Sequence, residues 1–114
     1  MIANPMKQIT DITLIESQSA QSALFILFGG PSCGVCKSIR PQLESMLKEH
    51  FPEIQSAYID CETSPEICAQ FSVFSLPVVK VFIEGKLVAE EFGAFSLSQL
   101  RDKLERYYSM WLSQ

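Results

Sequence analysis

The sequence predicts a single α/β domain, in which strands and helices alternate and a strand hairpin precedes the last helix. Three observations support this fold class. The first is a continuous apolar run, 23–28, which ends at two glycines and a proline and is typical of a strand buried on both faces of a sheet. The second is a helical apolar pattern directly after that run. The third is a pair of β-rich segments joined by a short turn that contains glycine.

The segment from about residue 33 to residue 50 is predicted to be a helix with one apolar face. Its apolar positions recur at spacings of four, three and one, and they are Ile39, Leu43, Met46 and Leu47. Lysine, arginine and glutamate occupy positions between them. Pro41 lies within this helix and is expected to kink it, because proline removes one backbone hydrogen bond.

Shorter elements surround this strand and helix. Residues 55–60 form a second predicted strand. A short helix should follow, with Ser64 as its N-cap and Pro65 at its first position. A weaker strand near residues 8–12 and a helix before Ser19 are expected to precede the central strand.

The last third of the chain predicts a hairpin and a final helix. The β-rich runs 77–83 and 87–92 are joined by residues 84–86, a connection short enough for an antiparallel hairpin at one edge of the sheet. Ser96 and Gln99 have the spacing of a capping box. The apolar stripe of the helix that they begin consists of Leu97, Leu100, Leu104, Tyr107 or Tyr108, and Trp111.

Composition limits the possible function classes. The 114 residues are 47% hydrophobic and 19% charged, so residues 1–114 are expected to fold as one domain. The net charge is −4, and the sequence lacks the basic stripe that nucleic acid binding requires. No apolar run reaches the roughly 18 residues of a membrane span, and no export signal is visible. We therefore expect a cytoplasmic protein that uses no nucleic acid and no membrane, with cysteines that mostly stay reduced.

The segment Cys33-Gly34-Val35-Cys36 is the main candidate for chemistry. It follows the buried strand and begins a helix, which is the context in which a CxxC pair is expected to be redox-active. Free backbone N–H groups and the helix dipole favour an anion at this position, so the pKa of the Cys33 thiol is expected to be lowered. Cys33 is then the candidate nucleophile, and Cys36 the residue that resolves a mixed disulfide by attacking Cys33.

The alternative for a CxxC pair is half of a zinc site, which normally needs a second close pair of ligands. Cys61 and Cys68 are separated by six residues, which is the wrong spacing. His50, the only histidine, lies near the far end of the helix that begins at Cys33. We favour the redox interpretation, and neither a metal nor another cofactor is predicted.

Several motifs occur together in a characteristic order. They are the strand 25–28, Cys33-Gly34-Val35-Cys36-Lys37, Pro41, Ile59-Asp60, Leu76-Pro77 and Phe92-Gly93-Ala94. In this order the chain resembles the thioredoxin family from about residue 7 to residue 108. The resemblance implies a thioredoxin-like fold, with a central mixed β-sheet flanked by helices on both faces.

The resemblance also implies a docking groove for an extended peptide. Leu76-Pro77 matches the family's cis-proline dipeptide, and Gly93 matches a glycine of its substrate groove. A cis Pro77 would leave the backbone groups of Leu76 free to pair with a partner beside Cys33. A trans proline at the first position of a strand is the alternative. The expected substrate-binding residues are Ser32, Gly34, Val35, Leu76, Pro77 and Gly93.

The chain departs from the family pattern at five positions. Leu27 stands where the family has a buried aspartate, and Ser56 stands where it has the partner lysine. Gly29 and Ser32 replace tryptophans, and Val35 replaces the proline of the motif. Without a buried carboxylate, Cys36 must lose its proton to water, to the partner or to a surface group, so we expect slow resolution. Asp60 is the nearest substitute in the sequence.

Cys61 and Cys68 allow several interpretations. Cys61 follows a strand at the sheet edge that also carries the CxxC, so it could be a redox partner. It could instead approach Cys68 on the next helix. Two small, buried and unbonded cysteines are the interpretation that we favour, because free cysteine is among the most buried residue types.

The predicted function is thiol–disulfide oxidoreduction with protein or peptide disulfides as substrates. A thioredoxin-reductase-type protein or glutathione would be the electron donor, and activity is expected to be weak because the relay residues are absent. The alternative is a thioredoxin-like binding module that keeps the groove and has little or no turnover.

Overall fold

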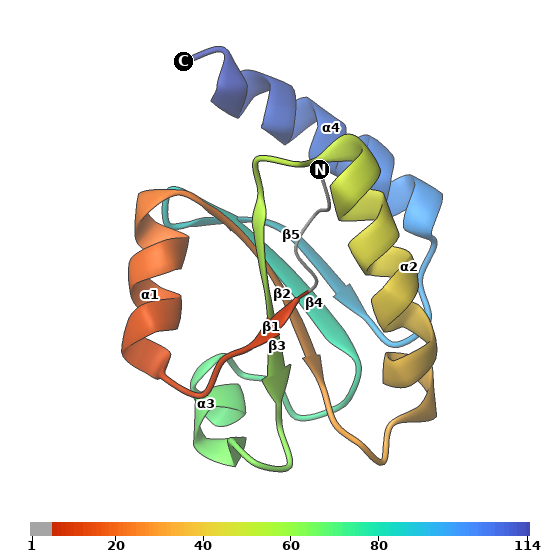
Figure 1. Ribbon diagram of the computed structural model, residues 1–114. Helices are drawn as coiled ribbons and strands as arrows, with labels where there is room; N and C mark the ends of the chain where they lie inside the picture. Colours follow the sequence, from red (N-terminus) through yellow and green to blue (C-terminus); the bar gives the residue numbers. More distant parts are fainter. Residues whose placement is uncertain (1–5) are drawn as a thin grey trace.

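The computed structural model describes residues 6–114. It contains a five-stranded mixed sheet with helices on both faces (Figure 1). This is the fold class that the sequence predicted. In chain order the elements are β1 (Lys7–Gln8), α1 (Ile12–Gln21), β2 (Ala23–Gly29), α2 (Gly34–His50), β3 (Gln55–Asp60), α3 (Pro65–Gln70), β4 (Val78–Ile83), β5 (Lys86–Phe92) and α4 (Leu97–Leu112).

The strand order β1-β3-β2-β4-β5 places the apolar strand β2 at the centre of the sheet, as predicted. β2 runs parallel to β3 and antiparallel to β4, with Gly29 opposite Asp60 and Phe28 opposite Val78. The carboxyl ends of β2 and β3 and the start of β4 therefore meet at one end of the sheet. That end carries Cys33, Cys61 and Pro77 on the segments next to these strands.

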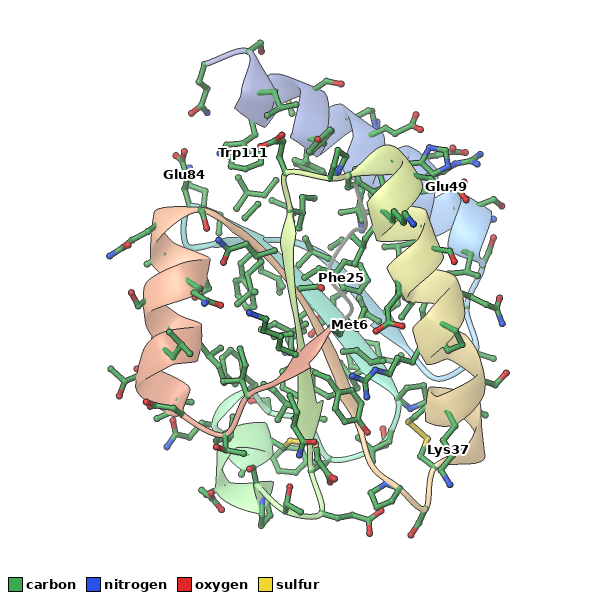
Figure 2. All side chains as sticks on the ribbon, in the orientation of Figure 1. Met6, Phe25, Lys37, Glu49, Glu84 and Trp111 are labelled. Atoms are coloured by element: carbon green, nitrogen blue, oxygen red, sulfur yellow. A yellow bond between two sulfur atoms is a disulfide. The ribbon has the colours of Figure 1, made fainter. Side chains whose placement is uncertain are left out.

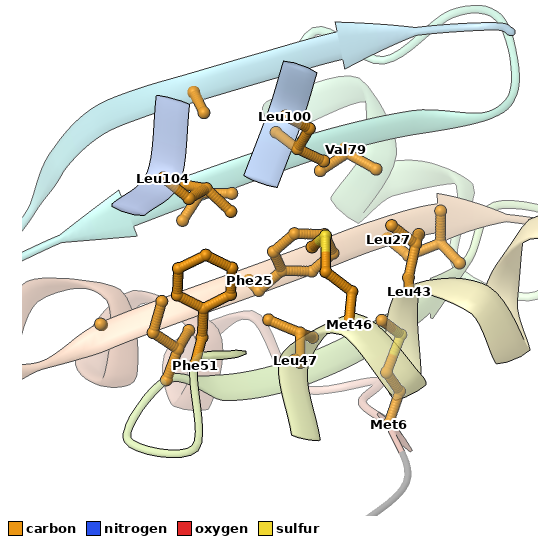
Figure 3. Close-up of a cluster of buried hydrophobic side chains, with 14 of the residues drawn as sticks. Met6, Phe25, Leu27, Leu43, Met46, Leu47, Phe51, Val79, Leu100 and Leu104 are labelled. Carbon is orange, nitrogen blue, oxygen red and sulfur yellow. The ribbon is translucent and has the colours of Figure 1, made fainter. Parts of the chain in front are cut away.

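Alternate residues of β2 face two separate cores, because successive side chains of a strand point to opposite faces. Phe25 and Leu27 belong to the core beneath α2 and α4, and their neighbours Ile26 and Phe28 belong to the core beneath α1 and α3. Figure 3 shows the first core, in which Phe25 lies among side chains from both covering helices. Both faces of β2 are fully buried, which explains its continuous apolar sequence.

The two cysteine-proximal helices begin where the sequence predicted. The buried side of α2 includes the predicted apolar positions. Pro41 lies within α2, and the kink expected there stays a prediction. Ser64 is the N-cap of α3 with Pro65 at the first turn, although the Ser64 side chain makes no capping hydrogen bond. The strand 55–60 has its predicted bounds.

The predicted hairpin and final helix are also present. β4 and β5 pair antiparallel at one edge of the sheet. The Ser96 side chain accepts a hydrogen bond from the backbone N–H of Gln99 at 3.2 Å and caps α4. Leu100 and Leu104 are fully buried, and Trp111 packs against the core from the far end of α4 (Figure 2).

The N-terminal strand predicted near residues 8–12 is wrong in extent. β1 covers only Lys7–Gln8, and Ile12 already belongs to α1. The cause is Asp11, whose side chain accepts the backbone N–H of Thr13 at 2.9 Å and begins the helix there. β1 is held in place by Met6, whose N–H donates to Glu44 of α2 and whose carbonyl accepts from Arg40.

Candidate active site

Cys33 is the N-cap residue of α2 and is bonded to Cys36 in a disulfide, with the two Cα atoms 5.2 Å apart. The local backbone explains this placement. The N–H of Cys33 donates to the carbonyl of Gly30 at 3.1 Å, which turns the chain from β2 into α2. The Cys33 sulfur also accepts the N–H of Cys36 at 3.2 Å, as an N-cap side chain does. The sequence prediction that Cys33 lies at the helix start is confirmed.

The two cysteines differ in accessibility. Cys36 is 1% exposed, whereas Cys33 is half-buried and its neighbours Ser32, Gly34 and Val35 are exposed. A partner molecule can therefore reach the Cys33 sulfur more readily than the Cys36 sulfur. Lys37 lies on the exposed side of the same turn, beside the disulfide (Figure 2).

The Leu76–Pro77 peptide bond is cis, which agrees with the form favoured from the sequence. The carbonyl of Pro77 accepts the N–H of Gly93 at 2.8 Å, so the segments before β4 and after β5 lie together. Gly93 has a φ of +61°, a conformation that glycine adopts without the steric cost of a side chain. Val78, the residue after Pro77, is opposite Phe28 near the end of β2. Pro77 and Gly93 therefore lie at the same end of the sheet as the CxxC segment.

Three apolar side chains on segments of this end are exposed to solvent. Val35 in the first turn of α2 is 49% exposed, Phe92 before Gly93 is 57% exposed, and Phe74 is 83% exposed. Phe74 precedes the Leu76–Pro77 dipeptide by two residues and belongs to none of the predicted motifs. The available signal was one aromatic residue in a Ser-rich loop that lacks helical or strand periodicity.

Gly29 is close to both the Tyr58 side chain and the buried Cys36. A Cβ atom on Gly29 would lie 3.0 Å from the Tyr58 hydroxyl oxygen and 3.1 Å from the Cβ of Cys36. The Tyr58 ring and the Cys36 Cβ therefore both border the space above Gly29. Tyr58 is 8% exposed, and the Arg40 guanidinium carbon lies 4.3 Å from the centre of its ring.

Burial raises the pKa of Tyr58, and the charges of Asp60 and Glu62 raise it further while Arg40 opposes them. A phenol with a raised pKa keeps its proton at neutral pH and can act as a hydrogen-bond donor. No sequence motif marks Tyr58, because it occupies an ordinary strand position.

Glu62 and Asp60 organise the turn after β3. Glu62 accepts the backbone N–H of Ser32 at 3.0 Å, and its carboxylate lies over Gly30. Asp60 accepts the N–H groups of Glu62 at 2.8 Å and Thr63 at 3.2 Å through one oxygen. Both carboxylates are therefore engaged with backbone amides next to the CxxC segment.

Leu27 and Ser56, where the resemblance to the family implies relay residues, lie on the neighbouring strands β2 and β3. Leu27 is fully buried in the core beneath α2, and Tyr58 is its register partner on β3. Ser56 is half-buried and lies opposite Phe25. No acidic side chain thus occupies the Leu27 position within the sheet.

Cys61 and Cys68 are bonded in a second disulfide, with Cα atoms 5.7 Å apart. The favoured interpretation of two unbonded cysteines is therefore wrong, and so is the expectation that the cysteines stay reduced. The Ser64 N–H donates to the Asp60 carbonyl at 2.8 Å, and this turn returns α3 to the end of β3. Cys68 is buried there at 2% exposure, and Cys61 is half-buried.

His50 is the last residue of α2, at the end opposite Cys33. Within residues 6–114, no three His, Cys, Asp or Glu side chains form a group that could bind a metal ion. No helix in this part of the chain is both long and apolar enough to cross a membrane.

Comparison with known proteins gives the family. The Thioredoxin family model matches residues 9–106. The chain is also 36% identical over 87 residues to Thioredoxin-like protein YdfQ of Bacillus subtilis, covering 76% of this chain and 77% of that protein. The chain belongs to the thioredoxin family. Membership supports thiol–disulfide oxidoreduction at the level of the family, through a CxxC pair that forms a disulfide.

Solved structures show the thioredoxin fold. Thioredoxin from Trypanosoma brucei brucei superposes with a TM-score of 0.82 at 24% identity, covering 95% of both chains. A second match comes from a structure on the thiol resolving mechanism in yeast mitochondrial 1-Cys peroxiredoxin via glutathione/thioredoxin systems. It has a TM-score of 0.75 at 23% identity and covers 92% of this chain and 94% of that chain.

Proposed function

We propose that this thioredoxin-family protein exchanges disulfides with protein or peptide partners, with Cys33 as the nucleophile and Cys36 as the resolving cysteine. The difference in accessibility between the two cysteines carries the proposal. Cys33 is half-buried at the N-cap of α2, where a thiolate is favoured, and Cys36 is 1% exposed one turn further along.

The proposed reaction has two exchange steps. The Cys33 thiolate attacks one sulfur of the partner disulfide, forms a mixed disulfide and releases the partner's other sulfur as a thiolate. The Cys36 thiolate then attacks the Cys33 sulfur, which forms the Cys33–Cys36 disulfide and releases the second partner thiolate. Two electrons have passed from the dithiol to the partner. A thioredoxin-reductase-type protein or glutathione would return them.

The proposed docking groove consists of backbone and apolar groups. Pro77 has no N–H, and its carbonyl is bonded to Gly93, so the backbone of Leu76 is the part available to an extended peptide. Ser32, Gly34 and Val35 are exposed beside Cys33 and complete the proposed groove. The exposed side chains of Phe74 and Phe92 support an apolar partner segment rather than a charged one.

We also propose that residues 1–114 act as one domain, with a cytoplasmic role in cell redox homeostasis. A protein disulfide as partner agrees with the yeast structure, which concerns a peroxiredoxin and the glutathione/thioredoxin systems.

An insulin reduction assay with dithiothreitol tests the activity. The wild-type protein should accelerate insulin precipitation, and Cys33→Ser should not accelerate it. Equal rates for both proteins would reject turnover and favour a binding module.

Partner capture tests the substrate class. In Cys36→Ser the mixed disulfide cannot be resolved, so a protein partner should stay bound under non-reducing conditions and be released by dithiothreitol. The double variant Cys33→Ser/Cys36→Ser is the matched control. Capture of glutathione alone would contradict a protein substrate.

A further inference from the structure

Cys36 must lose its proton before it can attack Cys33, yet both relay positions of the family are occupied by residues that cannot take it. Leu27 has no titratable group, and Ser56 carries no charge. The two carboxylates near the site, Asp60 and Glu62, are already engaged with backbone amides of turns. A hydrogen-bond donor near Cys36 would stabilise its thiolate and favour loss of the proton to solvent.

Tyr58 is a polar side chain that shares with Cys36 the space above Gly29. Its hydroxyl oxygen and the Cys36 Cβ lie 3.0 and 3.1 Å from one point above Gly29, and the Cys36 sulfur is one bond beyond that Cβ. Tyr58 is also the register partner of Leu27, on the strand beside it. The hydroxyl therefore comes from β3, the strand that pairs with β2 at Leu27.

Gly29 makes this arrangement possible. The family has a tryptophan at this position, and here even one methyl group would meet both Tyr58 and Cys36 at contacts that require a shift. The absence of a side chain at Gly29 therefore leaves the space in which the Tyr58 ring lies. The missing side chain at Gly29 and the large ring of Tyr58 are therefore complementary in volume.

We propose that the Tyr58 hydroxyl is a positioning group that donates a hydrogen bond to the Cys36 sulfur when the thiolate forms. The inference rests on the proposed function of Cys36. In this step Cys36 gives its proton to solvent, and Tyr58 keeps its own proton and stabilises the anion that remains. The Cys36 thiolate then attacks Cys33, and its electron pair forms the new S–S bond.

The charges around Tyr58 come from three elements. Arg40 lies over its ring from α2, and Asp60 on β3 and Glu62 on the following turn add negative charge. Lys37 of α2 is exposed beside Cys36. The acidic neighbours and burial keep the phenol protonated, which the donor role requires.

The first test measures the titration midpoint of the Cys36 thiol in the absence of any partner protein. In a Cys33→Ser background, the ¹³Cβ chemical shift of Cys36 is followed against pH. Removal of the hydroxyl in Tyr58→Phe should move the titration midpoint of Cys36 upward by about one pH unit, the effect of losing one hydrogen bond to an anion. Tyr107→Phe, at another partly buried tyrosine, is the matched control and should leave the midpoint unchanged.

A kinetic measurement with both cysteines present gives a second readout. Resolution of a mixed disulfide at pH 7 should be about tenfold slower in Tyr58→Phe, and the difference should disappear at a pH where Cys36 is fully ionised. A merely structural loss would slow the reaction equally at all pH values. An unchanged Cys36 midpoint, or a pH-independent loss of rate, would overturn the role of Tyr58.

The two proposals can fail separately. If insulin is reduced normally but the Cys36 midpoint ignores Tyr58→Phe, the oxidoreductase function stands and the Tyr58 role is rejected. If the midpoint shifts but no protein disulfide is reduced, the hydrogen bond exists and the proposed substrate class is wrong.

Discussion

Cys61 at the end of β3 and Cys68 in α3 are joined by a disulfide, so the strand and the helix that follows it are covalently linked. Both disulfides lie on segments at the same end of the sheet, and Figure 2 shows them as two separate sulfur pairs. The second pair lies on the opposite side of the sheet from α2, because Cys68 belongs to the core beneath α1 and α3. The two pairs therefore face different parts of the molecule.

Removal of the second disulfide should destabilise the protein. The double variant Cys61→Ala/Cys68→Ala is expected to lower the free energy of unfolding by about 2 kcal/mol under non-reducing conditions, because the unfolded chain loses a closed loop. Urea denaturation measures this change. The comparison should be repeated in dithiothreitol, where the difference should shrink. Identical urea midpoints without reductant would contradict a stabilising bond.

Cys33 should be the most reactive thiol of the fully reduced protein. Its position at the N-cap of α2 and its partial exposure favour attack, whereas Cys36 and Cys68 are buried. Limited iodoacetamide labelling at neutral pH, followed by peptide mass spectrometry, should modify Cys33 well before the other three cysteines. Faster labelling of Cys36 would reverse the assigned roles.

Leu27→Asp should lower stability and speed resolution. A carboxylate at this fully buried position loses its hydration and has no cation at Ser56, so we expect a loss of about 2–4 kcal/mol at pH 7. Burial raises the pKa of a carboxyl group, so the loss should be smaller at pH 4, where the group is protonated. The same carboxylate can accept the proton of Cys36.

Leu27→Asn is the matched control for Leu27→Asp. The asparagine side chain has nearly the same shape as aspartate, but its amide cannot accept the proton of Cys36 at neutral pH. This control should be destabilised without faster resolution, as judged by thermal melting and stopped-flow decay of a mixed disulfide. Destabilisation of Leu27→Asp with no gain in rate would mean that Cys36 already has a base or does not face Leu27.

Tyr58 should make the fold sensitive to alkaline pH. The folded-state pKa of Tyr58 is raised above the unfolded value of about 10. The stability that the protonated phenol provides is therefore complete below about pH 10 and is lost as the pH rises through the folded-state pKa. Stability should therefore fall less steeply above pH 10 in Tyr58→Phe than in the wild type. Urea midpoints between pH 8 and pH 11 measure this slope, with Tyr107→Phe as control. Equal slopes for wild type and Tyr58→Phe would contradict it.

The sequence by itself predicted the elements whose local signals agree with their packing. β2 was predictable because a strand buried on both faces must be apolar throughout, and α4 because its cap and its stripe lie at fixed spacings. The CxxC pair was predictable for the same reason, since its chemistry depends on its place between a buried strand and a helix. The N-terminal strand was wrong in extent because the local cap at Asp11 decides where α1 begins.

Tertiary structure alone decided what surrounds the cysteines. Whether Cys61 bonds to Cys68 depends on how the turn after Asp60 directs α3, and six intervening residues do not determine that path. Tyr58 and Gly29 are 29 residues apart in the chain, and they meet because of the register of β3 against β2 and the space left by the missing side chain of Gly29. Contacts of this kind follow from the packing of separate elements, because local sequence patterns carry information about faces and ends but not about which side chains meet.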